Sequence, residues 1–118
     1  MRPLDGVRVV DAATILAGPF AASVLGEFGA DVIKVEQPTV GDPMRRLGTA
    51  GPDGDTWWWL SDTRNKESVA LDLRTAEGAE SFRSMVDRAD VLVENYRTGT
   101  MERWGLGFES LRERNPRL

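Results

Sequence analysis

Four short apolar runs are spaced along the chain, and the segments between them carry apolar residues at helical spacing. Short apolar runs bounded by turn residues are typical of strands that are buried on both faces of a sheet. The pattern predicts strands at 7–11, 31–36, 68–73 and 90–94. Strands that alternate with helices indicate parallel βαβ units.

Start and stop signals predict the helices between these strands. Proline suits the first helical turn, so Gly18 followed by Pro19 predicts a helix that runs to about residue 28, with Gly29 as its left-handed C-cap. Thr75 is expected to cap a second helix, whose apolar residues recur every three or four positions: Ala79, Phe82, Val86 and Ala89. Shorter helices are predicted to start near 56–60 and to span 100–104 and 108–114.

The segment 37–55 interrupts this alternation. It holds prolines at 38, 43 and 52 and glycines at 41, 48, 51 and 54, which break helices and strands alike. The sequence therefore predicts a long irregular excursion. Excursions of this length in a compact domain are usually functional and often cover a ligand.

Together these elements predict an α/β protein with a Rossmann-like, doubly wound and mainly parallel sheet. At 118 residues the chain has room for one domain, 1–118. Residues 115–118 resemble the lead-in to a further strand, so we expect the sheet to be incomplete at its C-terminal end and the chain to be part of a larger enzyme.

Composition narrows the classes of function. The chain carries 15 basic and 19 acidic residues, a net charge of -4, which argues against nucleic acid as a partner because such binding normally requires a basic face. It has no cysteine and no histidine, which excludes disulfides, thiolate metal sites and histidine base catalysis, and no metal is expected. With no membrane-length apolar run and no secretory signal in the sequence, we expect a cytoplasmic protein that does not engage a membrane.

Lys34 and Lys66 are the only lysines among the basic residues. A preference for arginine indicates either selection for bidentate anion binding or a codon bias of the genome. Codon bias is the preferred interpretation for the chain as a whole. Arginine is treated as functional only where a ligand is expected.

Ligands of open α/β sheets bind outside the carboxyl ends of the strands. The positions that follow the predicted strands are 12–18, 37 onward, 74–75 and 95–97. Neither G-x-G-x-x-G nor G-x-x-x-x-G-K-[ST] occurs, so ordinary NAD-binding and ATP-hydrolysing sites lose their main support. Arg74, Arg97 and Arg103 are either phosphate contacts beside helix N-termini or solvated surface charges. These residues alone indicate an anion-binding α/β domain.

A series of motifs resembles, in order and spacing, the N-terminal part of the class III CoA-transferase family. The motifs lie at 4–11, 17–19, 25–36, 41–43, 64–73, 89–97 and 115–117. This family contains formyl-CoA transferase, the carnitine CoA-transferases and α-methylacyl-CoA racemase. The resemblance covers essentially the whole chain.

The resemblance implies that coenzyme A binds to this Rossmann-like domain within an interlocked homodimer, with acyl-CoA and carboxylic acid substrates. The family's CoA-contacting positions fall on Ile15, Leu16 and Ala17 after the first strand, Gln37 after the second, Leu71 and Arg74 after the third, and Asn95, Tyr96 and Arg103 after the fourth. By the same resemblance, Leu71 is on the adenine side, and Arg74 and Arg103 are on the phosphate side. Gln37 stands where an arginine is common, and Trp104 stands where methionine is frequent.

The resemblance also implies a mechanism. The family's transferases use an aspartate that attacks the thioester and passes through an anhydride and an aspartyl-CoA intermediate. In family members this aspartate comes later than residue 118, so no catalytic residue is assigned here and the chain alone is expected to be inactive. Asp11, Glu36 and Asp42 match scaffold positions, and Asp11 is expected to cap the turn after the first strand.

Three interpretations of the function remain open. The preferred one is the CoA-binding part of an acyl-CoA:carboxylate CoA-transferase. One alternative is an acyl-CoA racemase of the same family, which the motifs at 41–43 and 64–66 disfavour. The other is a non-catalytic CoA-binding subunit or fragment. The acyl substrate depends mainly on later segments.

The run Trp57, Trp58 and Trp59 is either an aromatic wall beside an acyl group or a packing surface. Packing is preferred, because consecutive positions on a helix point in different directions. Exposed tryptophans would then mark a partner surface, in a homodimer or with a second polypeptide that completes the fold.

Overall fold

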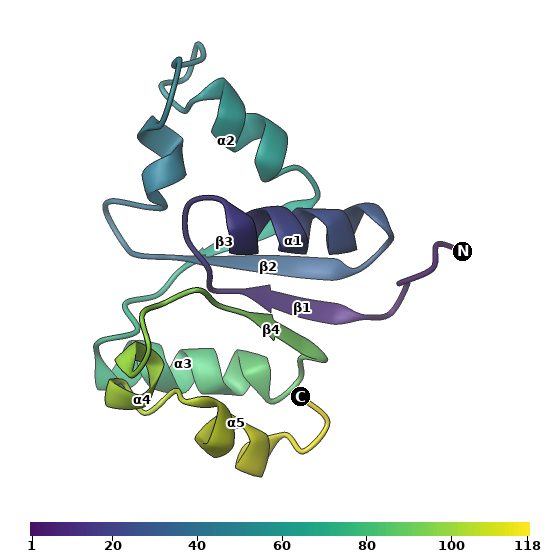
Figure 1. Cartoon of the computed structure of the whole chain (residues 1–118), viewed down its shortest axis with the longest axis vertical. Coiled ribbons are helices and arrows are strands. Elements are labelled where there is room, and N and C mark those ends of the chain that lie inside the picture. The colour runs from purple at the N-terminus through teal and green to yellow at the C-terminus, as the bar shows by residue number, and fades with distance from the viewer.

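A computed structural model describes all residues, 1–118, as a four-stranded sheet between two layers of helices (Figure 1). The strands lie in the order β3-β2-β1-β4 and have the bounds β1 Arg8–Asp11, β2 Asp31–Glu36, β3 Lys66–Ala70 and β4 Val91–Val93. Each neighbouring pair of strands is parallel. The predicted α/β class with a doubly wound parallel sheet is confirmed.

Helices cover both faces of the sheet (Figure 1). One layer holds α1 (Ala17–Glu27), the 3-10 helix η1 (Pro43–Arg46) and α2 (Trp57–Asp62). The other holds α3 (Ala76–Val86), α4 (Thr100–Arg103) and α5 (Phe108–Arg114). None of these helices combines the length and the apolar character that crossing a membrane requires.

The direction of strand addition reverses at β1. The chain passes from β1 through α1 to β2 and β3 on one side, and then returns through α3 to β4 on the other side of β1. The carboxyl ends of β1 and β4 therefore flank the switch point of the sheet. Open α/β sheets bind their ligands at this place.

Alternate residues of the central strands face opposite helix layers, as the two-residue period of a strand requires. Val10 and Val35 pack with Phe82 of α3 in a cluster of 11 buried residues. Val9 and Val32 face α1 in a smaller cluster of 4. The face toward α1 and α2 is less apolar, and buried polar side chains take up the rest of it.

Local helix signals are confirmed. The hydroxyl of Thr75 accepts a hydrogen bond from the Gly78 N–H at 3.0 Å, which caps α3. A Cβ at Gly78 would lie 2.0 Å from the Asp72 carbonyl oxygen, so this close turn requires glycine. Gly29 has φ +112° after α1, as expected of the left-handed cap.

Two predictions need correction. The third strand runs over Lys66–Ala70 and not over 68–73, because its first residues are polar at a sheet edge, while Leu73 belongs to the buried core beyond the strand. The segment 37–55 is not irregular throughout, since Asp42 accepts from the Met44 N–H at 2.9 Å and starts η1.

The tryptophans of α2 point in different directions, as predicted. Trp59 is 5% exposed, whereas Trp57 and Trp58 are 56% and 40% exposed. Only Trp59 contributes to the interior.

Candidate functional site

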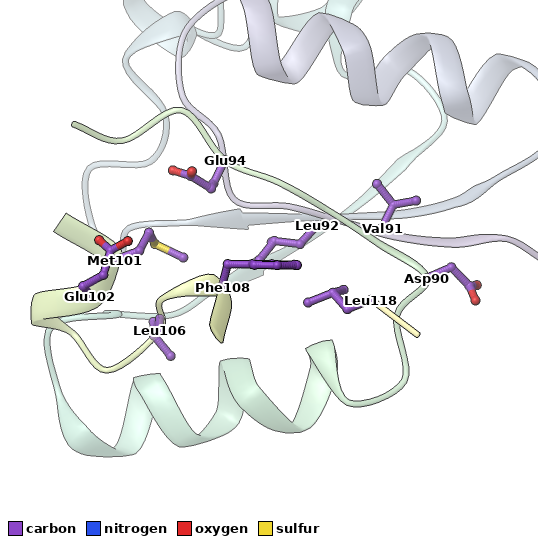
Figure 2. Close-up of a pocket in the computed structure, with 9 residues that line it drawn as sticks. All are labelled: Asp90, Val91, Leu92, Glu94, Met101, Glu102, Leu106, Phe108 and Leu118. Atoms are coloured by element: carbon purple, nitrogen blue, oxygen red, sulfur yellow. The ribbon is translucent and has the colours of Figure 1, made fainter. Parts of the chain in front are cut away.

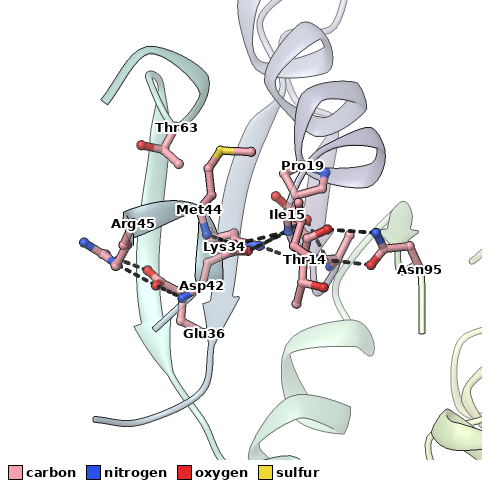
Figure 3. A network of polar contacts seen from close by, with 12 residues as sticks. Thr14, Ile15, Pro19, Lys34, Glu36, Asp42, Met44, Arg45, Thr63 and Asn95 are labelled. Atoms are coloured by element: carbon pink, nitrogen blue, oxygen red, sulfur yellow. Dashed lines mark hydrogen bonds and ion pairs between the residues drawn. The ribbon is translucent and has the colours of Figure 1, made fainter. Parts of the chain in front are cut away.

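The turn after β1, residues 12–16, is tied to the end of β4 (Figure 3). The Thr14 N–H donates to Asn95 Oδ1 at 2.8 Å, and Asn95 Nδ2 donates to the Thr14 carbonyl at 2.8 Å. The Ala12 N–H donates to the Val93 carbonyl at 2.9 Å. Asn95, a predicted ligand contact, therefore uses both ends of its amide to join the two strand ends at the switch point.

Two lysines and two aspartates form a buried charge cluster beneath this turn. Lys34 Nζ lies 3.0 Å from the Asp42 carboxylate and 3.8 Å from that of Asp11, and it donates to the Ala13 carbonyl. Lys66 Nζ lies 2.9 Å from Asp11. The side chains of both lysines are 1% exposed. Because an unpaired buried charge is strongly destabilising, this balance of cations and anions is what allows the cluster to be buried.

Asp11 does cap the turn, as predicted, since its Oδ1 accepts from the Ala13 N–H at 3.1 Å. Its carboxylate also pairs with the ammonium groups of Lys34 and Lys66. Lys66 also donates to the Pro19 carbonyl at 2.7 Å, which fixes the first turn of α1 over the cluster. Burial lowers the pKa of Lys66, and the Asp11 carboxylate opposes that effect.

Ile15 adopts a left-handed backbone conformation, with φ +67°. For a β-branched residue such a conformation is an outlier and costs on the order of 1–3 kcal/mol. The Ile15 N–H lies 3.2 Å from Asp42 Oδ1 and 3.3 Å from Oδ2. The side chains of Ile15 and Leu16 are exposed, and α1 begins at the next residue, Ala17.

Two adjoining pockets lie at the carboxyl ends of the strands, and together they are called the carboxyl-end groove. One, of about 80 Å³, is lined by Val35, Glu36, Gln37, Leu71, Asp72, Leu73, Arg74, Tyr96 and Trp104. The other, of about 180 Å³, is lined by Thr14, Val35, Glu36, Gln37, Val40, Gly41, Asp42, Pro43, Arg46 and Tyr96. The first pocket thus brings together four of the predicted contacts: Gln37, Leu71, Arg74 and Tyr96.

The groove offers an aromatic wall. Tyr96 meets Trp104 edge to face, with ring centroids 5.1 Å apart. Burial raises the pKa of Tyr96, and the carboxylates of Asp42 and Glu94 add to that effect, so the phenol stays neutral and able to donate a hydrogen bond. Aromatic faces beside a leucine suit a flat heteroaromatic ring.

Arg74 supplies the positive charge at the rim of the groove. Its Nε and Nη2 donate to the two carboxylate oxygens of Asp72, each at 2.8 Å. Hydrogen bonding to Asp72 raises the pKa of Arg74, and the Arg74 side chain is 58% exposed. A guanidinium held in this way by a neighbour is available to a phosphate on its outer side.

The remaining predicted contacts lie outside the groove. Arg103 is exposed on α4 and donates to the Thr100 hydroxyl at 3.1 Å. Ile15, Leu16 and Ala17 lie on the turn and at the start of α1 and line neither pocket. Conversely, the sequence did not single out Thr14 or Arg46, which line the second pocket. The sequence did contain a signal for Arg46, because this residue lies in the segment 37–55, which is expected to cover a ligand.

Glu36, the last residue of β2, anchors the excursion that follows it. Arg45 binds its carboxylate through two hydrogen bonds of 2.8 and 2.7 Å. Arg45 also binds Asp55 at 2.8 Å and stacks over Trp59 with its guanidinium carbon 4.0 Å from the ring centroid. These contacts order the far side of the groove.

Burial alone raises the pKa of Glu36, but hydrogen bonds from Arg45, the Asp42 N–H and Ser68 outweigh it and lower the pKa from 4.5 to about 2. Because the pKa is lower in the folded state, Glu36 stabilises the fold above about pH 4.5 and loses that contribution as the pH falls toward 2. The contribution is about 3 kcal/mol, at roughly 1.4 kcal/mol per pKa unit.

Urea unfolding at pH 7 and pH 3 measures this effect. Glu36→Gln is expected to remove most of the decrease in unfolding free energy between pH 7 and pH 3. Glu109→Gln, at an exposed position of α5, is expected to leave that decrease intact. If the unfolding free energy of Glu36→Gln depends on pH as strongly as that of the unchanged chain, other carboxylates cause the dependence.

A second, apolar groove runs along the outer edge of β4 and against α4 and α5 (Figure 2). It measures about 320 Å³ and is lined by Val91, Leu92, Met101, Leu106, Phe108 and Leu118, with the carboxylates of Asp90, Glu94 and Glu102 at its margins. Three carboxylates and no cation make it unsuited to a phosphate-bearing ligand. The carboxyl-end groove is therefore the candidate site.

Comparison with known proteins identifies the family. Residues 4–118 match the family model of CoA-transferase family III. The chain is 57% identical over 98% of its length to the succinyl-CoA–L-malate CoA-transferase beta subunit of Chloroflexus aurantiacus, and 47% identical over its whole length to the succinyl-CoA:mesaconate CoA-transferase of Haloarcula hispanica. It spans 29% and 31% of the lengths of these two relatives.

Solved structures show the same fold. A CAIB/BAIF family protein from Brucella suis matches 97% of this chain, with a TM-score of 0.89 and 42% sequence identity. A protein from Mycobacterium tuberculosis matches the whole chain, with a TM-score of 0.91 and 42% identity. The chain covers 31% and 32% of those structures. The resemblance noted in the sequence is confirmed: the chain belongs to CoA-transferase family III.

Proposed function

We propose that residues 1–118 are the N-terminal, CoA-binding Rossmann-like portion of an enzyme that transfers CoA between carboxylic acids. The observation that carries this proposal is the carboxyl-end groove. Residues that follow three separate strands, Gln37, Arg74 and Tyr96, converge there at the carboxyl ends of the sheet. Tyr96 follows β4, one of the two strands that flank the switch point.

The chemistry of the groove fits coenzyme A. Leu71 and the Tyr96–Trp104 pair offer apolar and aromatic surface for the adenine ring. Arg74 offers a charge-assisted hydrogen bond to a phosphate. The relatives are named for succinyl-CoA, so succinyl-CoA is the acyl donor to test first. Their names support the transferase over the racemase. The proposed reaction proceeds through an aspartyl intermediate on a residue outside 1–118.

Calorimetry with CoA and with NAD tests the binding. We expect CoA to bind in preference to NAD, because the glycine fingerprint of NAD sites is absent from the sequence. Arg74→Ala and Arg103→Ala are each expected to weaken CoA binding several-fold, because each removes a guanidinium that can make a charge-assisted hydrogen bond to a phosphate.

Arg112→Ala provides the control, because Arg112 lies on α5, away from the groove. It is expected to bind CoA like the unchanged chain. Equal affinities for NAD and CoA, or unchanged CoA binding in Arg74→Ala, the variant within the groove, would contradict the proposed site.

We also propose that the chain works as a homodimer or with a second polypeptide. Phe20, Trp57, Trp58 and Leu60 are exposed on the face of α1 and α2, and relatives exist as alpha and beta subunits. Exposed apolar clusters and an open sheet edge at β4 promote association with other chains.

Light scattering on the chain alone is expected to show dimers or larger species. Trp57→Glu is expected to reduce their population, whereas Glu109→Gln, on the opposite helix layer, is not. A monomer that unfolds cooperatively at high concentration would contradict this expectation.

A further inference from the structure

The left-handed conformation of Ile15, in the turn after β1, is held in place by the Asp42 side chain. Ile15 sits at φ +67°, and a β-branched residue keeps such a conformation only where its surroundings enforce it. Both carboxylate oxygens of Asp42 lie within 3.3 Å of the Ile15 nitrogen. The enforcing group therefore comes from a segment 27 residues away in sequence.

Asp42 is itself fixed in place. Its Oδ1 accepts from the Met44 N–H at 2.9 Å, and its Oδ2 lies 3.0 Å from Lys34 Nζ (Figure 3). Its side chain is 2% exposed. Lys34 in turn donates to the Ala13 carbonyl. The Lys34–Asp42 ion pair therefore contacts the turn at two places, the Ala13 carbonyl and the Ile15 N–H.

The rest of the turn is equally constrained. The N–H groups of Ala12, Ala13 and Thr14 donate to Val93, Asp11 and Asn95. With the Ile15 N–H on Asp42, each backbone N–H from 12 to 15 has a partner outside 12–16. The chain itself therefore supplies an acceptor for each of these N–H groups, and the side chains of Ile15 and Leu16 are left exposed.

We propose that Asp42, oriented by Lys34, is a positioning residue that holds the Ile15 turn in the conformation competent to bind CoA. The turn meets the carboxyl-end groove through Thr14, which lines its second pocket. This inference rests on the proposed function. Asp42 acts through the Ile15 backbone and needs no contact with the ligand. Without it, the turn relaxes to ordinary backbone conformations, and the apparent Kd rises by the inverse of the fraction that stays competent.

Asp42→Ala is therefore expected to raise the Kd for CoA by about 10- to 100-fold, given the strain that left-handed Ile15 carries. Glycine adopts positive φ without strain, so the same Asp42→Ala change made in an Ile15→Gly chain is expected to raise the Kd much less. Leu16→Gly is the matched control background, because Leu16 has φ -120° and gains nothing from glycine in that respect. There the full effect of Asp42→Ala is expected.

A second readout needs no ligand. In the free chain, amide hydrogen exchange at Ile15 is expected to be at least about tenfold faster in Asp42→Ala, because its acceptor is lost. The three-bond coupling between the Ile15 amide and α protons is expected to change as φ leaves the left-handed region. If the unchanged chain does not bind CoA, the proposed function fails, while these two measurements still decide whether Asp42 holds the turn.

The proposal is overturned if Asp42→Ala keeps both the CoA affinity and the slow Ile15 exchange of the unchanged chain. It is equally overturned if Asp42→Ala weakens binding to the same extent in the Ile15→Gly and Leu16→Gly backgrounds, since Asp42 would then serve only general stability. Should Asp42→Ala fail to fold, Asp42→Leu combined with Lys34→Met removes both buried charges together with the acceptor of the Ile15 N–H, and the same selective rescue by Ile15→Gly is required.

Discussion

A Lys34→Met chain is expected to lose about 3–5 kcal/mol of unfolding free energy, the range for removing one partner of a buried ion pair. The Lys34 side chain is 1% exposed, and its ammonium serves the Asp42 carboxylate and the Ala13 carbonyl. Methionine fills a similar volume but donates to neither oxygen. Since a small domain has only about 5–15 kcal/mol of stability, the variant is expected to be close to unfolding at room temperature.

Urea denaturation at neutral pH measures the loss. Arg8→Met is the matched control, because the Arg8–Asp31 pair is 3.6 Å apart and about half exposed, and such pairs contribute about 1 kcal/mol or less. Lys34→Met combined with Asp42→Asn is expected to recover part of the stability, since the two charges are removed together. A loss in Lys34→Met no larger than in Arg8→Met would show that the cluster does not depend on its charges.

Incubation with succinyl-CoA is expected to leave the chain covalently unmodified. Each of the three carboxylates that line the carboxyl-end groove already has a basic partner: Glu36 binds Arg45, Asp42 binds Lys34, and Asp72 binds Arg74. Covalent transfer needs a carboxylate free to reach the thioester carbon at near-attack distance. Binding without turnover should result.

Intact-mass and peptide mass spectrometry test this directly. Arg74→Ala frees the Asp72 carboxylate and serves as the most permissive variant, and it too is expected to show no adduct. An acyl or CoA adduct on Asp72, or on any other carboxylate of the chain, would place the nucleophile within residues 1–118.

Local signals predicted the fold well because they act over a few residues. The cap at Thr75 and the left-handed Gly29 each depend on neighbours in sequence, and both are present. The start of β3 is hard to predict because its first two residues are polar. Glu67 is exposed at the sheet edge, and Lys66 turns its side chain into the buried charge cluster. The apolar Leu73 marks the core and not the sheet.

The candidate site was predictable in part. The rule for strand ends and the family resemblance located Gln37, Leu71, Arg74 and Tyr96, which the fold brings into one pocket. The charge cluster was not predicted, because it joins residues from β1, β2, β3 and the excursion. A signal was present in the sequence, since both lysines of an otherwise arginine-rich chain lie in that cluster. A compact ammonium with three donors suits a small buried site better than a planar guanidinium does.

Amide chemical-shift mapping during a CoA titration is the most direct test of whether the carboxyl-end groove binds CoA. We predict saturable shifts at Gln37, Leu71, Arg74 and Tyr96, with smaller shifts at Ile15. Shifts confined to Leu92, Phe108 and Leu118 of the apolar groove, or no saturable shifts anywhere, would contradict CoA binding at the carboxyl ends of the strands.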